Sequence, residues 1–160
     1  MKLLFIDVKK AHLYGVVQEH ERVYVELPAE AGTPGKCGRL KRWLYGMRPA
    51  AQAWERDYTK KLEETGFKRG RSAPTVFFNE KTQVRGVVHG DDFTFLGYDE
   101  ELDMVTKHMQ EWYLLKVRAR VGPDAMDSKE VIILNRKLEW KHNGITFEAD
   151  DKHANILCKE

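Results

Sequence analysis

Paired carboxylates stand at a turn between two apolar runs, in the segment VVHGDDFTFLG at residues 87–97. Gly supplies positive φ and Asp bonds nearby backbone amides, so Asp91 and Asp92 alone predict only an ordinary hairpin. A third carboxylate, Asp7, follows the apolar run KLLFI at residues 2–6 and is expected at the end of a buried strand. If the two strands are neighbours, the aspartates converge at one rim of a sheet.

Converging carboxylates supply hard oxygen ligands, the ligand type that Mg²⁺ prefers. Mg²⁺ is usually held by one or two carboxylates together with substrate phosphates. Two such ions, about 3.5 to 4 Å apart, activate the attacking oxygen and stabilise the leaving group of an in-line displacement. Asp7, Asp91 and Asp92 are therefore candidate metal ligands and catalytic residues for phosphoryl transfer.

Other motifs with recognisable chemistry are absent from the sequence. Gly35-Lys36 does not begin a phosphate loop, because Glu30 stands where the loop needs Gly and Cys37 where it needs Ser or Thr. There is no HExxH, GxSxG or GxGxxG, and the histidines are scattered singly. Cys37 and Cys158 lack the spacing of a zinc site or a disulfide framework.

Length and composition predict one folded domain. The chain has 160 residues, of which 42% are hydrophobic and 32% charged, enough for a sizeable core. It contains no apolar run of ~18 residues, so we expect no membrane partner. It also lacks the features of a signal peptide, so we expect an intracellular protein, cytoplasmic or nuclear and not secreted. A net charge of +2 is small, so any nucleic-acid partner must be recognised by the local basic clusters at residues 35–42 and 67–71.

Periodicity predicts the elements that must position these groups. Besides residues 2–6, strands are expected at 22–27, 75–78, 84–89, 93–96 and 131–134, with a loop at 29–38 and a hairpin at 137–148 that turns at Asn143-Gly144. This order predicts an α+β fold, an antiparallel sheet with helices packed on one face.

Two helices are predicted between these strands. The first begins after Pro49 and ends near Gly66, which suits a C-terminal cap, and the second is capped by Asp99. The expected buried stripes are Ala51, Trp54, Tyr58 and Leu62 in the first helix, and Leu102, Val105, Met109 and Trp112 in the second.

Several segments, in order along the chain, match the motifs of one family. FIDVKKAHLYG (5–15) is similar to LDVKTAFLNG, and VYVELP (23–28) is similar to VYMEQP. The segment at 39–70 resembles LKKSLYGLKQAPRAWY with its trailing helix, VVHGDDFTFLG takes the place of YVDDILITG, and VIILNRKLEW (131–140) resembles YFLGIEI. The chain thus resembles the reverse transcriptase of copia-type long-terminal-repeat retrotransposons.

The resemblance implies the palm subdomain of a right-hand polymerase, truncated at both ends. Residues 1–139 would be the palm with partial fingers elements, and residues 140–160 a hairpin and the start of a thumb-ward extension. The implied activity is RNA-directed DNA polymerisation, in which a nucleotide is added to a primer 3′-hydroxyl with two Mg²⁺ ions, Mn²⁺ being the alternative ion. The implied partners are an RNA or DNA template-primer, deoxynucleoside triphosphates and the remainder of a Pol polyprotein.

The resemblance also assigns roles to individual positions. Asp7, Asp91 and Asp92 would bind the metal ions, with the Val8 carbonyl as a further ligand. The residues implied at the incoming nucleotide are His12, Tyr45, Gly46 and Arg48. His12 stands where the family has a Phe that crowds the sugar 2′ position. The residues implied at the template-primer are Arg39, Lys41, Arg42, Lys68, Arg69, Arg71, Leu134 and Asn135.

Departures from the family motifs keep further functional hypotheses open. His89-Gly90 replaces Tyr-Val before the aspartates, His12 replaces Phe, and Asn135 replaces Gly in the primer-gripping motif. The alternative to an active polymerase is an inactive or repurposed retrotransposon remnant that binds nucleic acid. A more remote hypothesis is a two-metal nuclease, which would need a water-activating group such as His89.

Overall fold

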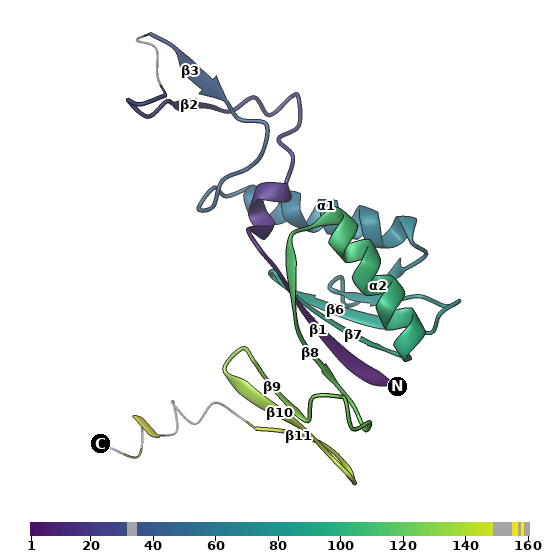
Figure 1. The fold of residues 1–160 in the computed structure, drawn as a ribbon. Coiled ribbons are helices and arrows are strands. Elements are labelled where there is room, and N and C mark those ends of the chain that lie inside the picture. The colour runs from purple at the N-terminus through teal and green to yellow at the C-terminus, as the bar shows by residue number, and fades with distance from the viewer. Residues whose placement is uncertain (32–34, 149–154, 157, 159–160) are drawn as a thin grey trace.

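The computed structural model describes residues 1–31, 35–148, 155–156 and 158 (Figure 1). Its helices are the 3₁₀ helix η1 (Ala11–Tyr14), α1 (Ala50–Glu64) and α2 (Asp99–Trp112). Its strands are β1 (Lys2–Val8), β2 (Tyr24–Glu26), β3 (Cys37–Arg39), β4 (Lys68–Arg69), β5 (Val76–Phe78), β6 (Arg85–His89), β7 (Asp92–Gly97), β8 (Leu115–Val121), β9 (Glu130–Ile133), β10 (Arg136–Lys141) and β11 (Gly144–Phe147).

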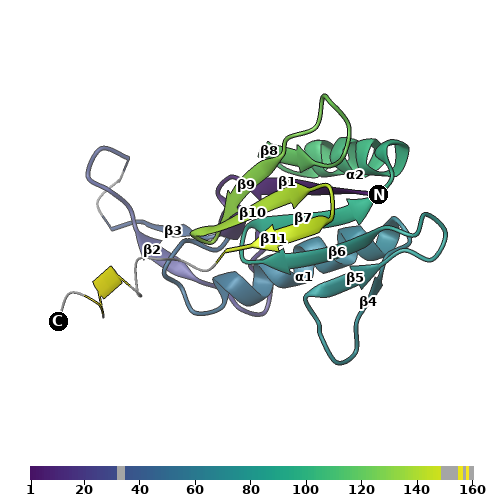
Figure 2. The same ribbon diagram turned by 90° about the horizontal axis from the view of Figure 1, so that it is seen from below.

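A six-stranded sheet in the order β4-β5-β6-β7-β1-β8 forms the centre of the molecule, and every neighbouring pair in it is antiparallel. Both α1 and α2 cover one face, while the three-stranded sheet β11-β10-β9 lies over the other (Figures 1 and 2). The β2–β3 hairpin extends away from this body beyond η1 (Figure 1). The predicted α+β architecture, antiparallel with helices on one face, is confirmed.

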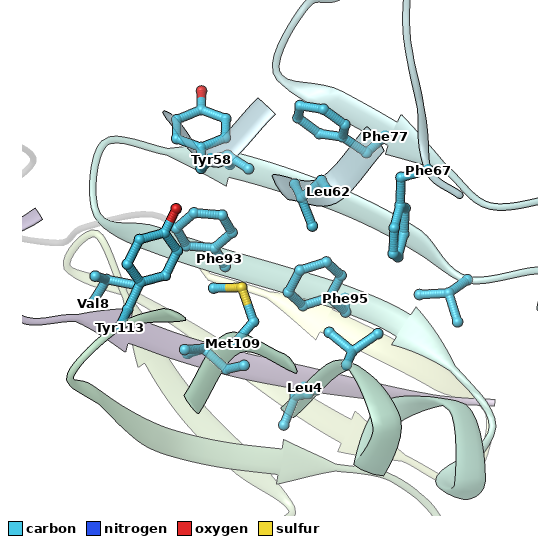
Figure 3. Packing of buried hydrophobic residues seen from close by; sticks show 14 of the residues in the cluster. Leu4, Val8, Tyr58, Leu62, Phe67, Phe77, Phe93, Phe95, Met109 and Tyr113 are labelled. Atoms are coloured by element: carbon cyan, nitrogen blue, oxygen red, sulfur yellow. The ribbon is translucent and has the colours of Figure 1, made fainter. Parts of the chain in front are cut away.

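The main core fills the space between the sheet and the two helices (Figure 3). Alternation along β1 sends Leu4, Ile6 and Val8 toward the helices and Leu3 and Phe5 toward the opposite face. The aromatic rings in this core meet mostly edge to face, as their quadrupoles favour. Those that form such contacts include Trp54, Tyr58, Phe77, Phe93 and Tyr113.

Both helices lie where the sequence predicts them, with two corrections. Ala51 is exposed, and Ala50 and Ala53 are the buried alanines of α1, because the buried face of the helix is rotated from the expected stripe. Tyr98, not Asp99, holds the cap position of α2. Asp99 lies in the first turn, where its carboxylate pairs with basic side chains from β1 and β8 instead of capping backbone amides.

The strands expected at 22–27, 75–78, 84–89, 93–96 and 131–134 are present as β2, β5, β6, β7 and β9, with ends shifted by at most two residues. Other strands differ from the expectation. β8 is missing from the prediction, β3 falls partly in the expected loop at 29–38, and the β10–β11 turn is formed by His142 and Asn143, one residue earlier than predicted. The predicted neighbours at residues 2–6 and 93–96 do pair, as β1 and β7. The short strands depend on tertiary pairing, to which local periodicity is insensitive.

The C-terminal part of the chain bears on the expected domain division. The boundary expected after residue 139 falls inside β10. Residues 149–154, 157 and 159–160, which hold most of the expected thumb-ward extension, lie outside the described residues. Among the residues that are described, no helix is both long and apolar enough to cross a membrane.

Candidate functional site

Four polar side chains form a row across one end of the main sheet. The strand register pairs His89 with Asp92, Asp92 with Asp7, and Asp7 with Lys116, so the row spans β6, β7, β1 and β8. Directly opposed residues project from the same face, with Cβ atoms about 4.5 to 5.5 Å apart. Because Leu3 and Phe5 face away from the helices, Asp7 two residues further also does, and the row lies on the helix-free face.

Asp91 lies beside this row, in the turn between β6 and β7. His89 and Asp92 close the hairpin, which leaves Gly90 and Asp91 as its two turn residues, and Gly90 adopts φ +64°. The Asp91 carbonyl accepts a hydrogen bond of 2.9 Å from the Val8 amide, which ties the turn to the end of β1. The sequence-based expectation that a strand end and a hairpin tip meet is therefore confirmed.

A buried aromatic side chain of α1 forms a hydrogen bond with the same turn. Trp54 in α1 is 2% exposed, and its indole Nε1 donates a hydrogen bond of 2.8 Å to the Gly90 carbonyl. Sequence periodicity predicts Trp54 only as a core residue, and no local pattern indicates this contact. The main core thereby positions the turn that carries Asp91.

Arg118 binds the two opposed carboxylates of the row. Its guanidinium nitrogens lie 3.3 Å from Asp7 Oδ1 and 3.8 Å from Asp92 Oδ1. The β1–β8 register shifts between Phe5 and Ile6, which pair with Ala119 and Val117, so Arg118 is the extra residue of a β-bulge. A bulge re-aims side chains, and here it turns Arg118 onto the carboxylate face. Arg118 was not among the predicted site residues, because β8 was not predicted as a strand.

The surroundings of Asp92 oppose its ionisation. Its burial raises the pKa of Asp92 above the ordinary aspartate value, and the Asp91 and Asp7 carboxylates raise it further. The charges of Arg118 and His89 act in the opposite direction. A cation beside Asp92 would therefore favour its ionised form.

The expected metal ligands are only partly gathered. Within the ranges that the structure describes, no group of three or more His, Cys, Asp or Glu side chains is arranged to hold a metal ion. Asp7 and Asp92 are paired across the strands, whereas the Asp91 side chain is exposed at the turn. The backbone amide of Val8 donates a hydrogen bond to the Asp91 carbonyl. The chemistry available here is that of two opposed carboxylates with a third next to them.

Two of the residues expected at the incoming nucleotide lie together. The rings of His12, in η1, and Tyr45 are 4.6 Å apart between centroids and tilted by 34°, and His12 Nδ1 is buried without a hydrogen-bond partner in the described chain. Gly46 turns the chain at φ +85°, and a Cβ added there would meet no atom of the described residues within 4 Å, so its backbone conformation explains the glycine. Arg48 is exposed.

The basic residues expected at the template-primer fall into two separate places. Arg39 belongs to β3 and is followed by Lys41 and Arg42, whereas Lys68 and Arg69 form β4 at the far edge of the main sheet (Figure 2). Arg42 donates to the Tyr14 carbonyl, Lys68 pairs with Glu80 at 2.8 Å, and Arg69 pairs with Glu55. Arg71 is exposed. The structure does not unite the two clusters into one surface.

Leu134 and Asn135 form the tight turn between β9 and β10. They lie between the paired residues Ile133 and Arg136, with φ values of +49° and +59°. This turn points toward the same end of the molecule as the carboxylate row (Figures 1 and 2). Asn tolerates positive φ, but a bulky residue such as Leu adopts it at a cost.

Comparisons with known proteins relate most of the chain to one family. The family model described as "Reverse transcriptase (RNA-dependent DNA polymerase)" matches residues 2–122. A curated relative, the "Retrovirus-related Pol polyprotein from transposon TNT 1-94" of Nicotiana tabacum, is 28% identical over 104 residues. That alignment covers 61% of this chain and 8% of the relative, so the chain corresponds to a small part of the polyprotein's length.

Proposed function

The chain belongs to the reverse transcriptase (RNA-dependent DNA polymerase) family, in the form found in copia-type retrotransposons, and on that premise we propose that it is the palm core of such an enzyme. The proposed reaction adds a deoxynucleoside monophosphate to a primer 3′-hydroxyl on an RNA template and releases pyrophosphate. The proposed partners are a template-primer, deoxynucleoside triphosphates and the remainder of a Pol polyprotein.

The observation that carries this proposal is the pairing of Asp7 with Asp92 across β1 and β7, beside the turn that bears Asp91. Asp7 and Asp92 are 85 positions apart in the sequence, and each lies in a segment that resembles a catalytic motif of the family. Two carboxylates on neighbouring strands fit a reaction that depends on holding charged groups in place.

A divalent metal ion suits the donor set of this site. Asp7 and Asp92 supply carboxylate oxygens from one face, and Mg²⁺ commonly takes one or two carboxylates and completes its coordination with water and substrate phosphates. Asp91, exposed at the turn, is available as a further ligand. When bound, such an ion would lower the pKa of an attacking hydroxyl and neutralise charge on the phosphates.

The other residues of the chain would orient the reactants. His12 and Tyr45, in contact beyond the end of β1, would flank the incoming nucleotide. The β9–β10 turn at Leu134 and Asn135 would contact the primer. The basic residues on β3 and after it would bind template phosphates, without sequence preference and with a strong dependence on salt.

Primer extension tests the polymerase proposal directly. The wild-type chain would be assayed on an RNA template with Mg²⁺ and deoxynucleotides, beside Asp7→Asn and Asp92→Asn. Glu111→Gln is the matched control, because it removes one exposed carboxylate on α2. We expect each aspartate variant to lose about 100-fold or more in rate, the scale of one lost transition-state contact, and the control to lose none.

A second function, nucleic-acid binding without polymerisation, is favoured by one specific observation. Arg118 contacts both Asp7 and Asp92, so the protein's own side chain already compensates part of the charge that a metal ion would balance. A wild-type chain that extends no primer but retards a labelled template-primer in a salt-sensitive way would support this alternative. That outcome would contradict the polymerase proposal.

A further inference from the structure

Arg118 occupies the position from which a cation would neutralise the carboxylate pair. It contacts Asp7 and Asp92 together, and both carboxylates are mostly withdrawn from water, with side-chain exposures of 25% and 18%. Half-buried carboxylates that face one another repel, so a positive charge between them stabilises the folded chain.

The contact is close enough to compensate part of the charge of the two carboxylates, but its distances are long for an ion pair. Charge-assisted hydrogen bonds from nitrogen to carboxylate are usually about 2.7 to 2.9 Å long. Arg118 donates one of 3.3 Å to Asp7 and lies 3.8 Å from Asp92, beyond hydrogen-bond length. The side chain is 38% exposed, so it can swing into water without crossing the core. Its position follows from the β-bulge, since regular alternation from Ala119 would turn residue 118 toward the helices.

We propose that Arg118 is an internal counter-ion, which holds Asp7 and Asp92 in the metal-free chain and competes with a divalent ion for the same two carboxylates. This inference rests on the proposed function, in which Asp7 and Asp92 bind the metal. Because the guanidinium and the ion exclude one another, Arg118 sets the metal affinity of the site.

Lys116 offers a charge-matched comparison. It is the cross-strand neighbour of Asp7 on β8 and carries the same charge, but no ion pair joins it to either carboxylate in the described chain. Removal of Lys116 therefore changes the local electrostatic potential only, while removal of Arg118 also frees the ligands.

The experiment measures Mn²⁺ binding to the full chain by electron paramagnetic resonance, without nucleic acid or nucleotides. The samples are the wild type, Arg118→Met, Lys116→Met and Asp7→Asn. We expect Arg118→Met to bind Mn²⁺ about tenfold more tightly than the wild type, within the usual range of coupling between two exclusive ligands. Lys116→Met should tighten binding clearly less, and Asp7→Asn should weaken it.

Thermal unfolding gives a second readout. In metal-free buffer Arg118→Met should unfold at a lower temperature than the wild type, and Mn²⁺ should raise its midpoint by more, because the bound ion replaces the lost charge. If Arg118→Met does not fold, Arg118→Lys replaces it. A single ammonium cannot span both carboxylates as the guanidinium does, so its Mn²⁺ affinity should exceed that of the wild type.

The outcomes separate this inference from the proposed function. If the wild type binds Mn²⁺ through Asp7 but Arg118→Met binds it no more tightly, the counter-ion inference is wrong and the metal site stands. Equal tightening by Lys116→Met would also overturn the inference, because the effect would then be one of net charge. If no variant binds Mn²⁺, or if Asp7→Asn binds it unchanged, both the metal site and the inference fail.

Discussion

At the scale of single residues, the indole of Trp54 joins the core to the turn that carries Asp91. Substitution Trp54→Phe keeps an aromatic ring in the core but removes the donor to the Gly90 carbonyl. Trp43 is the matched control, because it is equally buried, at 3% exposure, and its Nε1 has no hydrogen-bond partner among the described residues. The two substitutions therefore differ by one hydrogen bond.

We expect Trp54→Phe to lower the free energy of unfolding by about 1 kcal/mol more than Trp43→Phe, the net worth of a typical hydrogen bond. The measurement is urea denaturation of both variants, with hydrogen exchange at the Asp91 and Asp92 amides as a local readout. Exchange there should accelerate only in Trp54→Phe. Equal losses and unchanged exchange would mean that the bond to Gly90 does not hold the turn.

The carboxylates of the site could be placed from the sequence, but their immediate partners could not. Asp91 lies in a turn of Gly and Asp, and Asp7 ends an apolar run, so both carry local signals. Arg118 meets Asp7 only because a bulge re-aims it from β8, and Trp54 reaches Gly90 across 36 positions of sequence. Neither contact has a local pattern, since each depends on how distant elements pack.

At the scale of elements, Lys2 connects the start of β1 to the start of α2 and to the loop after β8. Its ammonium lies 2.9 Å from Asp99, 2.7 Å from Asp124 and 2.9 Å from Asp127, and its own side chain is 11% exposed. The hydrogen bonds that Lys2 donates to Asp124, Asp127 and Asp99 raise the pKa of Lys2. Lys2 therefore remains charged wherever the protein is folded.

The same cluster predicts how stability depends on acid. The hydrogen bond to Lys2 lowers the pKa of Asp99, and although burial raises the pKa of Asp127, its bonds to Lys2 and the Asp124 amide lower it overall. A carboxylate whose pKa is depressed on folding contributes stability above its unfolded value of about 3.9 and loses it below. The contribution from Lys2 should thus be present at neutral pH and vanish in acid.

We predict that Lys2→Met lowers the unfolding temperature at pH 7, and that the difference from the wild type shrinks as pH falls below about 3.9. Thermal melts from pH 2.5 to 7 test this, with Lys60→Met as a control for an exposed lysine whose pair with Glu64 is 3.9 Å long. A difference that stays constant across that range would contradict the linkage.

The helices and strands with regular periodicity were predicted correctly, whereas β8 was missed. The stripe of Leu102, Val105 and Met109 is buried as the three-four spacing requires. In β8, by contrast, Arg118 and Arg120 break the apolar pattern, since Arg118 faces Asp7 while Arg120 binds Asp99 and Asp103 of α2. A strand with charged residues on both faces lacks the alternation that marks a strand in sequence.

At the scale of the whole molecule, the two faces of the main sheet are covered unequally. The helices close over a large core, whereas β9–β11 packs on a small cluster whose buried members, among the described residues, are Phe5, Ala119 and Val121. Segments with little buried apolar area open at lower free energy than the rest of a protein. We therefore expect β9–β11, together with its turn at Leu134 and Asn135, to open separately from the helical layer.

Trp140→Ala tests this division, because Trp140 packs on the small cluster from β10. We expect it to lower the opening free energy of β9–β11 amides by more than about 1 kcal/mol, a fraction of the cost of a fully buried Trp→Ala, while amides of β1 and β7 keep theirs. Ile132→Ala is the control, since Ile132 lies on the outer face of the same sheet at 67% exposure. Native-state hydrogen exchange gives the measurement. Should wild-type β10 and β1 exchange at the same free energy, the two layers form one cooperative unit, and the β9–β10 turn cannot move independently of the carboxylate row.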